Sequence, residues 1–103
     1  MFRGILSTIY LDLFPRKNIK TIHEELLNFY KKNNFVKVLK LNKLLSTNDV
    51  INTNKCHISV CKSKDKNKII ILSSLDNLIK GGSGQAVQNL NILFGFNENT
   101  GLH

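Results

Sequence analysis

The residues in this chain that could do chemistry are two cysteines, three histidines and a cluster of glycines. Cys56 and Cys61 are five positions apart, so in a strand their side chains would point to opposite faces. Five extended residues span roughly 16 Å, which is beyond the reach of a disulfide. The histidines, at positions 23, 57 and 103, make no ligand spacing with either cysteine. The pattern indicates structural cysteines, with neither a disulfide nor a metal site.

The glycine cluster is Gly81, Gly82 and Gly84, between an apolar run that ends at Leu72 and a segment with helical spacing. Backbone N–H groups at a helix start are unpaired and favour anions, and glycine lets a ligand approach the backbone closely. The spacing is not the G-x-G-x-x-G dinucleotide fingerprint, and no ribose-binding acid follows at the right distance. By itself the pattern favours a glycine turn into an ordinary amphipathic helix.

That helix is expected to follow Gly84 and to end at Gly95, a residue that tolerates positive φ. One face of it is rich in amides. The opposite face carries an apolar stripe at helical spacing, Ala86, Val87, Leu90, Leu93 and Phe94.

The first part of the chain predicts a strand and then a helix. RGILSTIYLDLF, residues 3–14, alternates with Ile5 and Ile9 on one face, and Pro15 would end the strand. Thr21 followed three residues later by Glu24 is a capping box, which predicts a helix over residues 21–32. His23 lies in the first turn, where we expect it to face solvent.

The middle of the chain predicts three more strands. A short strand is expected over residues 35–39 and an extended loop over 40–55. Strands over 57–62 and 68–74 are joined by a charged loop with the length and chemistry of a hairpin. The order of elements indicates an α+β fold, with a mixed or antiparallel sheet of about four strands and two helices.

Alternation also predicts which side chains of the hairpin are buried. Cys56, Ile58 and Val60 would face inward, and His57 and Ser59 outward. The run from position 69 to position 72, IIIL, has no polar side, so that strand would be covered on both faces.

Composition restricts the class of protein. The 103 residues suffice for one domain or part of one, and 42% hydrophobic residues is ordinary for a globular chain. No apolar run has the length of a membrane span and the start lacks the shape of a signal peptide, so we expect a cytoplasmic protein. The net charge of +8 comes mostly from lysine, which favours a solvated basic surface over a nucleic-acid site.

Five blocks of the sequence, in order, resemble one family. They are RGILSTIY, ELL…FYKKNNFVKVL, the stretch TNDV…TN-x-C, DNLIKGGSGQAVQNLNILFGF and TGL. Together they cover essentially the whole chain and are similar to the C-terminal third of the N-acetyl-gamma-glutamyl-phosphate reductases. The chain departs from the family at Asn52, where glycine is common, and at Gly82, where alanine is usual. The resemblance implies part of a glyceraldehyde-phosphate-dehydrogenase-like C-terminal domain.

The resemblance implies an activity in arginine biosynthesis. Enzymes of this family reduce N-acetylglutamyl 5-phosphate to N-acetylglutamate 5-semialdehyde with NADPH, through a cysteine thiolate and a base histidine. Both residues would lie upstream of Met1, together with the dinucleotide-binding domain. No catalytic residue is therefore expected in this chain, and the chain alone is expected to be inactive.

The family also implies roles for parts of this chain. Asn77, Gly81 and Gly82 would approach the nicotinamide end of NADP. Residues 1–76 would belong to the catalytic and dimerisation domain, and residues 77–103 would form a helix that packs back on the missing dinucleotide-binding portion. A homodimer or homotetramer is expected for the complete enzyme, with neither a nucleic acid nor a membrane as a partner. Two alternatives stay open: a non-catalytic oligomerisation or binding module, and a small basic nucleic-acid-binding protein.

Overall fold

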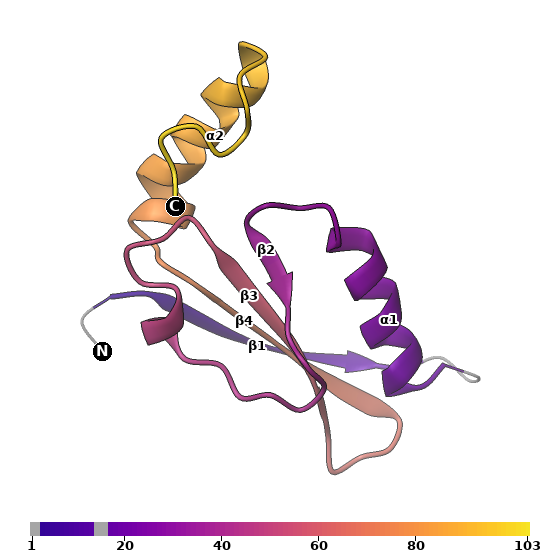
Figure 1. The fold of residues 1–103 in the computed structure, drawn as a ribbon. Coiled ribbons are helices and arrows are strands. Elements are labelled where there is room, and N and C mark those ends of the chain that lie inside the picture. The colour runs from indigo at the N-terminus through magenta and orange to yellow at the C-terminus, as the bar shows by residue number, and fades with distance from the viewer. Residues whose placement is uncertain (1–2, 14–16) are drawn as a thin grey trace.

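The structure is a computed structural model that describes residues 3–13 and 17–103. Figure 1 shows a sheet with one helix beside it and a second helix that projects away. The elements, in chain order, are β1 (Ile5–Asp12), α1 (Ile19–Tyr30), β2 (Val36–Val38), the 3-10 turn η1 (Thr47–Asp49), β3 (Cys56–Lys62), β4 (Lys68–Leu75), the π-helical turn η2 (Ile79–Ser83) and α2 (Gly84–Leu93).

The four strands form one mixed sheet in the order β1-β4-β3-β2. β4 is antiparallel to β1 and to β3, whereas β2 is parallel to β3. The α+β class, the four strands, the two helices and the β3–β4 hairpin are thus confirmed. Pro15, the expected end of the first strand, lies outside the described residues, and β1 itself ends at Asp12.

The N-terminal cap of α1 differs from the prediction. The helix begins at Ile19 because the Asn18 side chain accepts a hydrogen bond from the Thr21 backbone N–H at 2.8 Å. Asn18 has extended backbone angles, as an N-cap requires, and asparagine ranks above threonine at that position. The predicted capping box at Thr21 and Glu24 is therefore wrong, and its threonine lies inside the first turn.

His23 does not simply face solvent. Its ring is half-buried, and Nε2 lies 2.7 Å from the carbonyl oxygen of Leu39, to which an imidazole N–H can donate. The bond ties the second turn of α1 to Leu39, the residue that follows β2. The solvent-facing prediction is wrong because His23, the fifth residue of α1, lies beside the sheet edge that α1 packs against.

The segment between β2 and β3 lies against the opposite face of the sheet from α1. Ser59 is fully buried, and its hydroxyl donates to the carbonyl of Lys43 at 2.5 Å. Ser59 pairs with Leu72 of β4, and Ile69 lies three residues before Leu72, so the side chains of Ser59 and Ile69 point to opposite faces of the sheet. Ile69 lies on the α1 side and is 2% exposed. The prediction that Ser59 faces outward is therefore wrong. The segment expected to be an extended loop also contains η1.

Much of the sheet is open. Of the apolar run in β4, only Ile69 is buried and the next three residues are partly exposed, so the expected cover on both faces is wrong for this chain. β1 pairs with β4 along one edge only, and its apolar side chains are exposed on both faces: Ile5, Leu6, Ile9, Tyr10 and Leu11.

The size of the surface agrees with this openness. The accessible surface is 7193 Å², against about 5,900 Å² for a compact protein of 11.7 kDa. Four apolar residues of the described chain are buried, Phe35, Val50, Val60 and Ile69, alongside seven polar ones. Among the described residues, no helix has the length and apolarity to cross a membrane.

Candidate functional site

The corner where β4 runs into α2 is organised by the carboxylate of Asp76, which is fully buried. One carboxylate oxygen accepts from the backbone N–H groups of Leu78 at 2.9 Å and Ile79 at 3.3 Å. The other accepts from the Asn52 N–H at 2.8 Å and forms an ion pair with Arg3 at 2.7 Å. A single side chain thus holds the start of β1, the segment before β3 and the turn after β4 together.

These partners decide the charge state of Asp76. Burial raises the pKa of the carboxyl, but the backbone N–H groups of Asn52, Leu78 and Ile79, with the charge of Arg3, outweigh it. The pKa of Asp76 therefore lies below its ordinary value, and the side chain is ionised at neutral pH.

Asn52 makes this arrangement possible through its backbone. Its φ is +65°, in the left-handed region that asparagine tolerates better than most residues other than glycine. Arg3 Nη2 also donates to the Asn52 side-chain oxygen at 2.5 Å. Asparagine at this position therefore adopts the positive φ of the turn and adds a contact to the Arg3–Asp76 pair.

Asn77, the first of the expected cofactor residues, lies next to Asp76. Its side-chain oxygen accepts from the backbone N–H of Gly4 at 2.8 Å, which fixes the residue before β1. Gly4 has a φ of +112°, so this position favours glycine. The amide nitrogen of Asn77 donates to no residue in the described part of the chain, and the side chain is half-exposed.

Gly81 and Gly82 are exposed on the turn η2, within a few residues of Asn77. The Gly81 N–H donates to the Asp76 carbonyl at 3.1 Å, so the turn winds back on the buried carboxylate. A Cβ at Gly81 would meet its nearest neighbour, Leu75 Cδ1, at 3.5 Å, which is ordinary contact. The structure brings the three predicted residues together on one exposed corner.

The helix start differs from the one expected. Helical turns begin at Ile79, in a π-helical turn that Gly82 interrupts with φ −145° and ψ −112°, and α2 follows from Gly84 without a side-chain cap. A Cβ at Gly84 would lie 2.5 Å from the Asn54 side-chain oxygen and 2.7 Å from the Ile79 carbonyl. Gly84 is thus needed for close packing. Gly95, with φ +73°, lies just past the end of α2 as expected.

A polar network behind the corner was not anticipated from the sequence. Gln88, which is nearly buried, accepts from Lys80 Nζ at 2.7 Å and from the Asn54 amide at 2.9 Å, and donates to Glu98 at 2.6 Å. The signal was present in the amide-rich face of α2, but amides on one face do not identify their partners. This network joins α2 to the segment before β3 and to the C-terminal tail.

Lys80 is the one cation of that network. Its Nζ lies 5.4 Å from the centre of the Phe35 ring, within the range of a cation–π interaction. Burial lowers the pKa of Lys80, and the neighbouring Cys56 and Glu98 oppose that shift. The lysine is therefore held between an aromatic ring and an amide.

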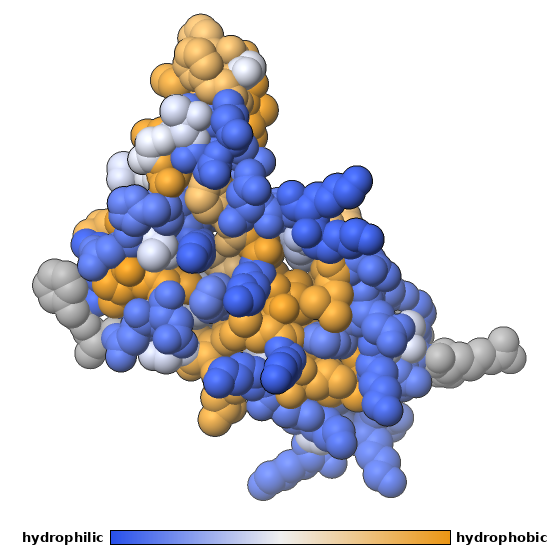
Figure 2. Space-filling view, viewed as in Figure 1, coloured by the Kyte–Doolittle hydropathy of each residue, from blue (hydrophilic) through white to orange (hydrophobic). Residues whose placement is uncertain are grey.

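The apolar stripe of α2 faces away from the network. Among its members, Val87 is 40%, Leu90 50%, Leu93 79% and Phe94 64% exposed, whereas Gln88 and Asn91 on the other face are buried. Figure 2 shows apolar residues gathered on the projecting α2 and its C-terminal end. The helix therefore packs on its own chain through amides and leaves its hydrophobic side uncovered.

The cysteines lie on opposite faces of β3, as their spacing predicted. Cys56 Sγ is 3.5 Å from the Ser73 hydroxyl, and Cys61 Sγ is 3.7 Å from the Ser59 hydroxyl; both thiols are free. Within residues 3–13 and 17–103, no group of three or more His, Cys, Asp and Glu side chains could hold a metal ion.

Comparison with known proteins defines the class of protein first. A family model described as semialdehyde dehydrogenase, dimerisation domain, matches residues 1–77. The chain belongs to the semialdehyde dehydrogenase family, and the matched residues include the whole sheet, Asp76 and Asn77, whereas Gly81, Gly82 and α2 follow them.

The relatives narrow this further and confirm the resemblance found in the sequence. Over 102 residues, the chain is 48% identical to the N-acetyl-gamma-glutamyl-phosphate reductase of Thermoanaerobacter sp. (strain X514), covering 99% of this chain and 30% of that protein. It is 46% identical over 101 residues to the protein of the same name from Clostridium botulinum (strain Eklund 17B / Type B), covering 98% and 29%. The chain thus spans about 30% of the length of these relatives.

Proposed function

We propose that this chain is part of an N-acetyl-gamma-glutamyl-phosphate reductase that makes N-acetylglutamate 5-semialdehyde for arginine biosynthesis in the cytoplasm. The observation that carries the proposal is an identity of 46–48% along nearly the whole chain to reductases of that name. Because the chain covers about 30% of those proteins, the reaction is a property of the assembled enzyme.

We assign the cysteine nucleophile and its base to the rest of that enzyme. A cysteine nucleophile needs a base close to its sulfur, since the thiolate is the reactive form. Here Cys56 and Cys61 have serine hydroxyls as their nearest hydrogen-bonding side chains. We therefore expect the nucleophile and its base outside this chain, and no reductase activity from the 103 residues alone.

The role proposed for this chain at the site is to border the nicotinamide half of NADPH. The residues present fit that group: the Asn77 amide nitrogen is not engaged by the described residues, and Gly81 and Gly82 are exposed without side chains between backbone and solvent. NADPH supplies the hydride when bound. Asn77 would donate to its carboxamide or to a bridging water, and the glycines would let the backbone pass close to it.

A structural role for Asn77 is part of the same arrangement. Its side-chain oxygen already accepts from the Gly4 N–H, so the orientation of the amide nitrogen is fixed by β1. This bond supports the proposal, because a donor held in place from behind loses little freedom on binding.

Two exposed apolar surfaces suit the assembly of the complete enzyme. We assign β1, whose large apolar side chains are exposed on both faces, to contacts within a homodimer or homotetramer, in keeping with the family description of a dimerisation domain. We assign the stripe of α2, within residues 77–103, to packing on the dinucleotide-binding portion. Apolar patches of this kind are otherwise rare on monomers.

A chimera tests the proposed function. The Thermoanaerobacter reductase would carry this chain in place of its own matched segment, with the same protein lacking the segment as control. We expect NADPH oxidation with N-acetylglutamyl 5-phosphate from the chimera and none from the control. A chimera that is folded and oligomeric but oxidises no NADPH would overturn the proposal and favour a non-catalytic oligomerisation module.

The cofactor corner is tested in the same chimera with two variants. Asn77→Asp keeps an oxygen for the Gly4 N–H and removes the amide donor, and Gly81→Val adds bulk where a Cβ has room. We expect each to raise the KM for NADPH about tenfold or more, the cost of losing one buried polar contact, with the melting temperature nearly unchanged. Variants that melt earlier but keep the parent KM would show that the corner is structural.

A further inference from the structure

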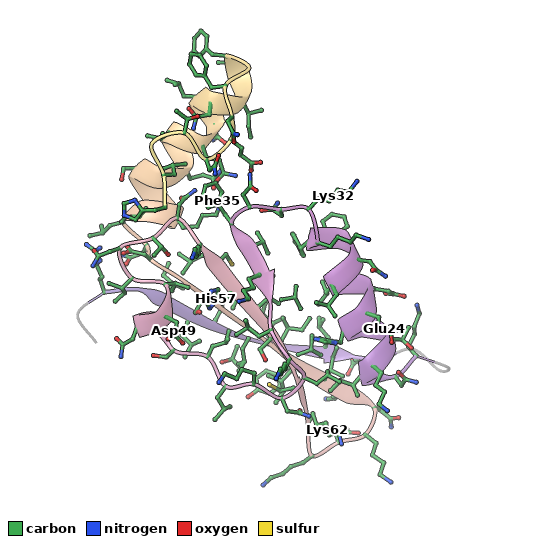
Figure 3. All side chains as sticks on the ribbon, in the orientation of Figure 1. Glu24, Lys32, Phe35, Asp49, His57 and Lys62 are labelled. Carbon is green, nitrogen blue, oxygen red and sulfur yellow. The ribbon has the colours of Figure 1, made fainter. Side chains whose placement is uncertain are left out.

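A hollow of about 670 Å³ on the described surface follows the free edge of β2 and is separate from the Asp76 corner. On one side it is lined by the last turns of α1, with Leu27, Tyr30 and Lys31. On the other side it is lined by Asp49, Lys55 and His57, with β2 between the two sides. Figure 3 shows β2 between α1 and the side chains of His57 and Asp49.

The backbone of β2 offers hydrogen-bonding groups to this groove. The Phe35 carbonyl accepts from Cys56 at 2.7 Å and the Leu39 N–H donates to Ile58 at 2.8 Å, so residues 35 and 39 face β3. Successive residues of a strand direct their backbone N–H and C=O groups toward alternate edges. The backbone groups of Val36 and Val38 therefore point away from β3.

One of the outward groups of β2 is already used. The Val36 N–H donates to the Asn33 side chain at 3.1 Å. The Val36 carbonyl and both backbone groups of Val38 form no hydrogen bond within the described part of the chain. These groups can pair with one more extended strand.

The side chains along the groove alternate in chemistry. Val36 and Val38 register with Cys56 and Ile58 on the α1 side, whereas Lys37 registers with His57 on the other side. A strand added to β2 would therefore place every second side chain against apolar residues and the intervening ones beside Lys37 and Lys55.

The charge of the groove selects among possible strands. Three lysines, Lys31, Lys37 and Lys55, line it against one acid, Asp49. His57 adds no charge at neutral pH, because burial, with Lys37 and Lys55, lowers its pKa despite Asp49. An added strand that carries acidic side chains at alternate positions would match this excess of positive charge.

A second copy of this chain does not supply such a strand. Across its four strands Asp12 is the one acidic residue, at the end of β1, and no strand alternates acidic with apolar residues. The matching strand therefore comes from a sequence other than these 103 residues.

We propose that the groove between β2 and α1 binds an extended peptide segment of a partner protein by strand addition, with acidic residues alternating with small apolar ones. The backbone of the segment pairs with Val36 and Val38, its apolar side chains contact the α1 side, and its carboxylates lie beside Lys37 and Lys55. Because β2 is three residues long, the segment binds weakly, with a Kd on the order of 100 µM.

The probe is the capped peptide Glu-Val-Glu-Val-Glu, titrated into the isotope-labelled 103-residue chain and followed by amide chemical shifts. Two control peptides separate charge from strand pairing: Lys-Val-Lys-Val-Lys, and the acidic peptide with both valine nitrogens methylated. We expect shifts that map to residues 33–38 and 55–57, and binding of each control weaker by about tenfold. Three results would each overturn the proposal: equal binding of all three peptides, shifts that map to the β3–β4 loop at residues 62–68, or no binding at 5 mM.

Variants of the chain give the matched test. Lys37→Glu combined with Lys55→Glu should weaken the acidic peptide at least about tenfold and strengthen the basic one. Lys64→Glu combined with Lys66→Glu makes the same charge change on the β3–β4 loop and should change either affinity by less than about twofold. Val38→Pro removes the outward N–H at an edge where proline is tolerated, and should weaken the acidic peptide without unfolding the chain. Unchanged affinity in the folded Lys37/Lys55 and Val38 variants would refute strand addition.

Discussion

Replacing Asp76 by Asn should be one of the most destabilising single changes of a polar residue in this chain. The carboxylate is fully buried and satisfies three backbone N–H groups as well as Arg3. An amide can still accept from Leu78 and Ile79 with its oxygen, but its NH₂ group would then face two further donors, the Asn52 N–H and Arg3. We expect a loss of about 3–5 kcal/mol in the free energy of unfolding, because two buried donors lose their acceptor and a paired charge loses its partner.

The measurement is urea unfolding of the 103-residue chain, followed by circular dichroism, at a series of pH values. At pH 7 the transition midpoint of Asp76→Asn should fall by about 2–5 M, for a slope near 1–1.5 kcal/mol per M. If Asp76→Asn is already unfolded without urea, that result also agrees with the expected loss in the free energy of unfolding. Asp12→Asn is the control: that side chain is 86% exposed and 3.9 Å from Lys68, so its loss should cost under about 0.5 kcal/mol.

The pH dependence tests the cause of the effect. The pKa of Asp76 is below its ordinary value of 3.8 in the folded chain, so its stabilisation is fully present above about pH 4 and is lost as the pH falls through the folded pKa. The difference between the parent chain and Asp76→Asn should therefore be constant from pH 7 to about pH 4 and shrink below it. A difference under about 1 kcal/mol at pH 7, or one that does not shrink in acid, would refute the assignment.

Three further outcomes are expected. Gly84→Ala should lower the free energy of unfolding by about 1–3 kcal/mol, because its Cβ would lie 2.5 Å from the Asn54 side chain. As a control, Gly81→Ala should change the free energy of unfolding by under about 0.5 kcal/mol, and equal urea midpoints for the two variants would contradict this expectation. Replacing both Cys56 and Cys61 by Ser in the chimeric reductase should leave kcat nearly unchanged, and a loss of about a thousandfold or more would identify a nucleophile among them. The isolated chain should self-associate in analytical ultracentrifugation, and Leu90→Lys with Leu93→Lys should reduce that association; a monomeric parent would contradict the role given to the α2 stripe.

Local patterns in the sequence were sufficient for the four strands and the two α-helices, though not for the short turns η1 and η2. Alternation predicted the strands, the charged loop predicted the β3–β4 hairpin, and helical spacing predicted α2 with Gly95 at its end. These features depend on residues close together in the chain, whose conformations are restricted by their own backbone preferences. Where two local signals competed, the sequence did not choose correctly: Asn18 caps α1, although Thr21 and Glu24 form the more recognisable motif.

The candidate corner was predicted in part. The sequence located Asn77, Gly81 and Gly82 next to each other, but it did not indicate that Asn77 holds Gly4 or that Asp76 is the buried centre of the turn. Both facts depend on residues more than twenty positions away. No spacing rule relates such residues, because their meeting depends on the order of the strands in the sheet.

Burial of polar groups was decided by the tertiary structure alone. Ser59 was expected to face outward on a strand, and Gln88 lies on the amide face of a helix whose apolar stripe was expected to need a partner. Ser59 is buried because the Lys43 carbonyl accepts its hydroxyl, and Gln88 because Asn54, Lys80 and Glu98 satisfy its amide. A polar side chain can leave water only where partners replace its hydrogen bonds, and those partners come from distant segments of the chain. The sequence therefore determined which elements form and which faces are apolar, while the fold decided which polar groups are buried and which apolar ones stay exposed.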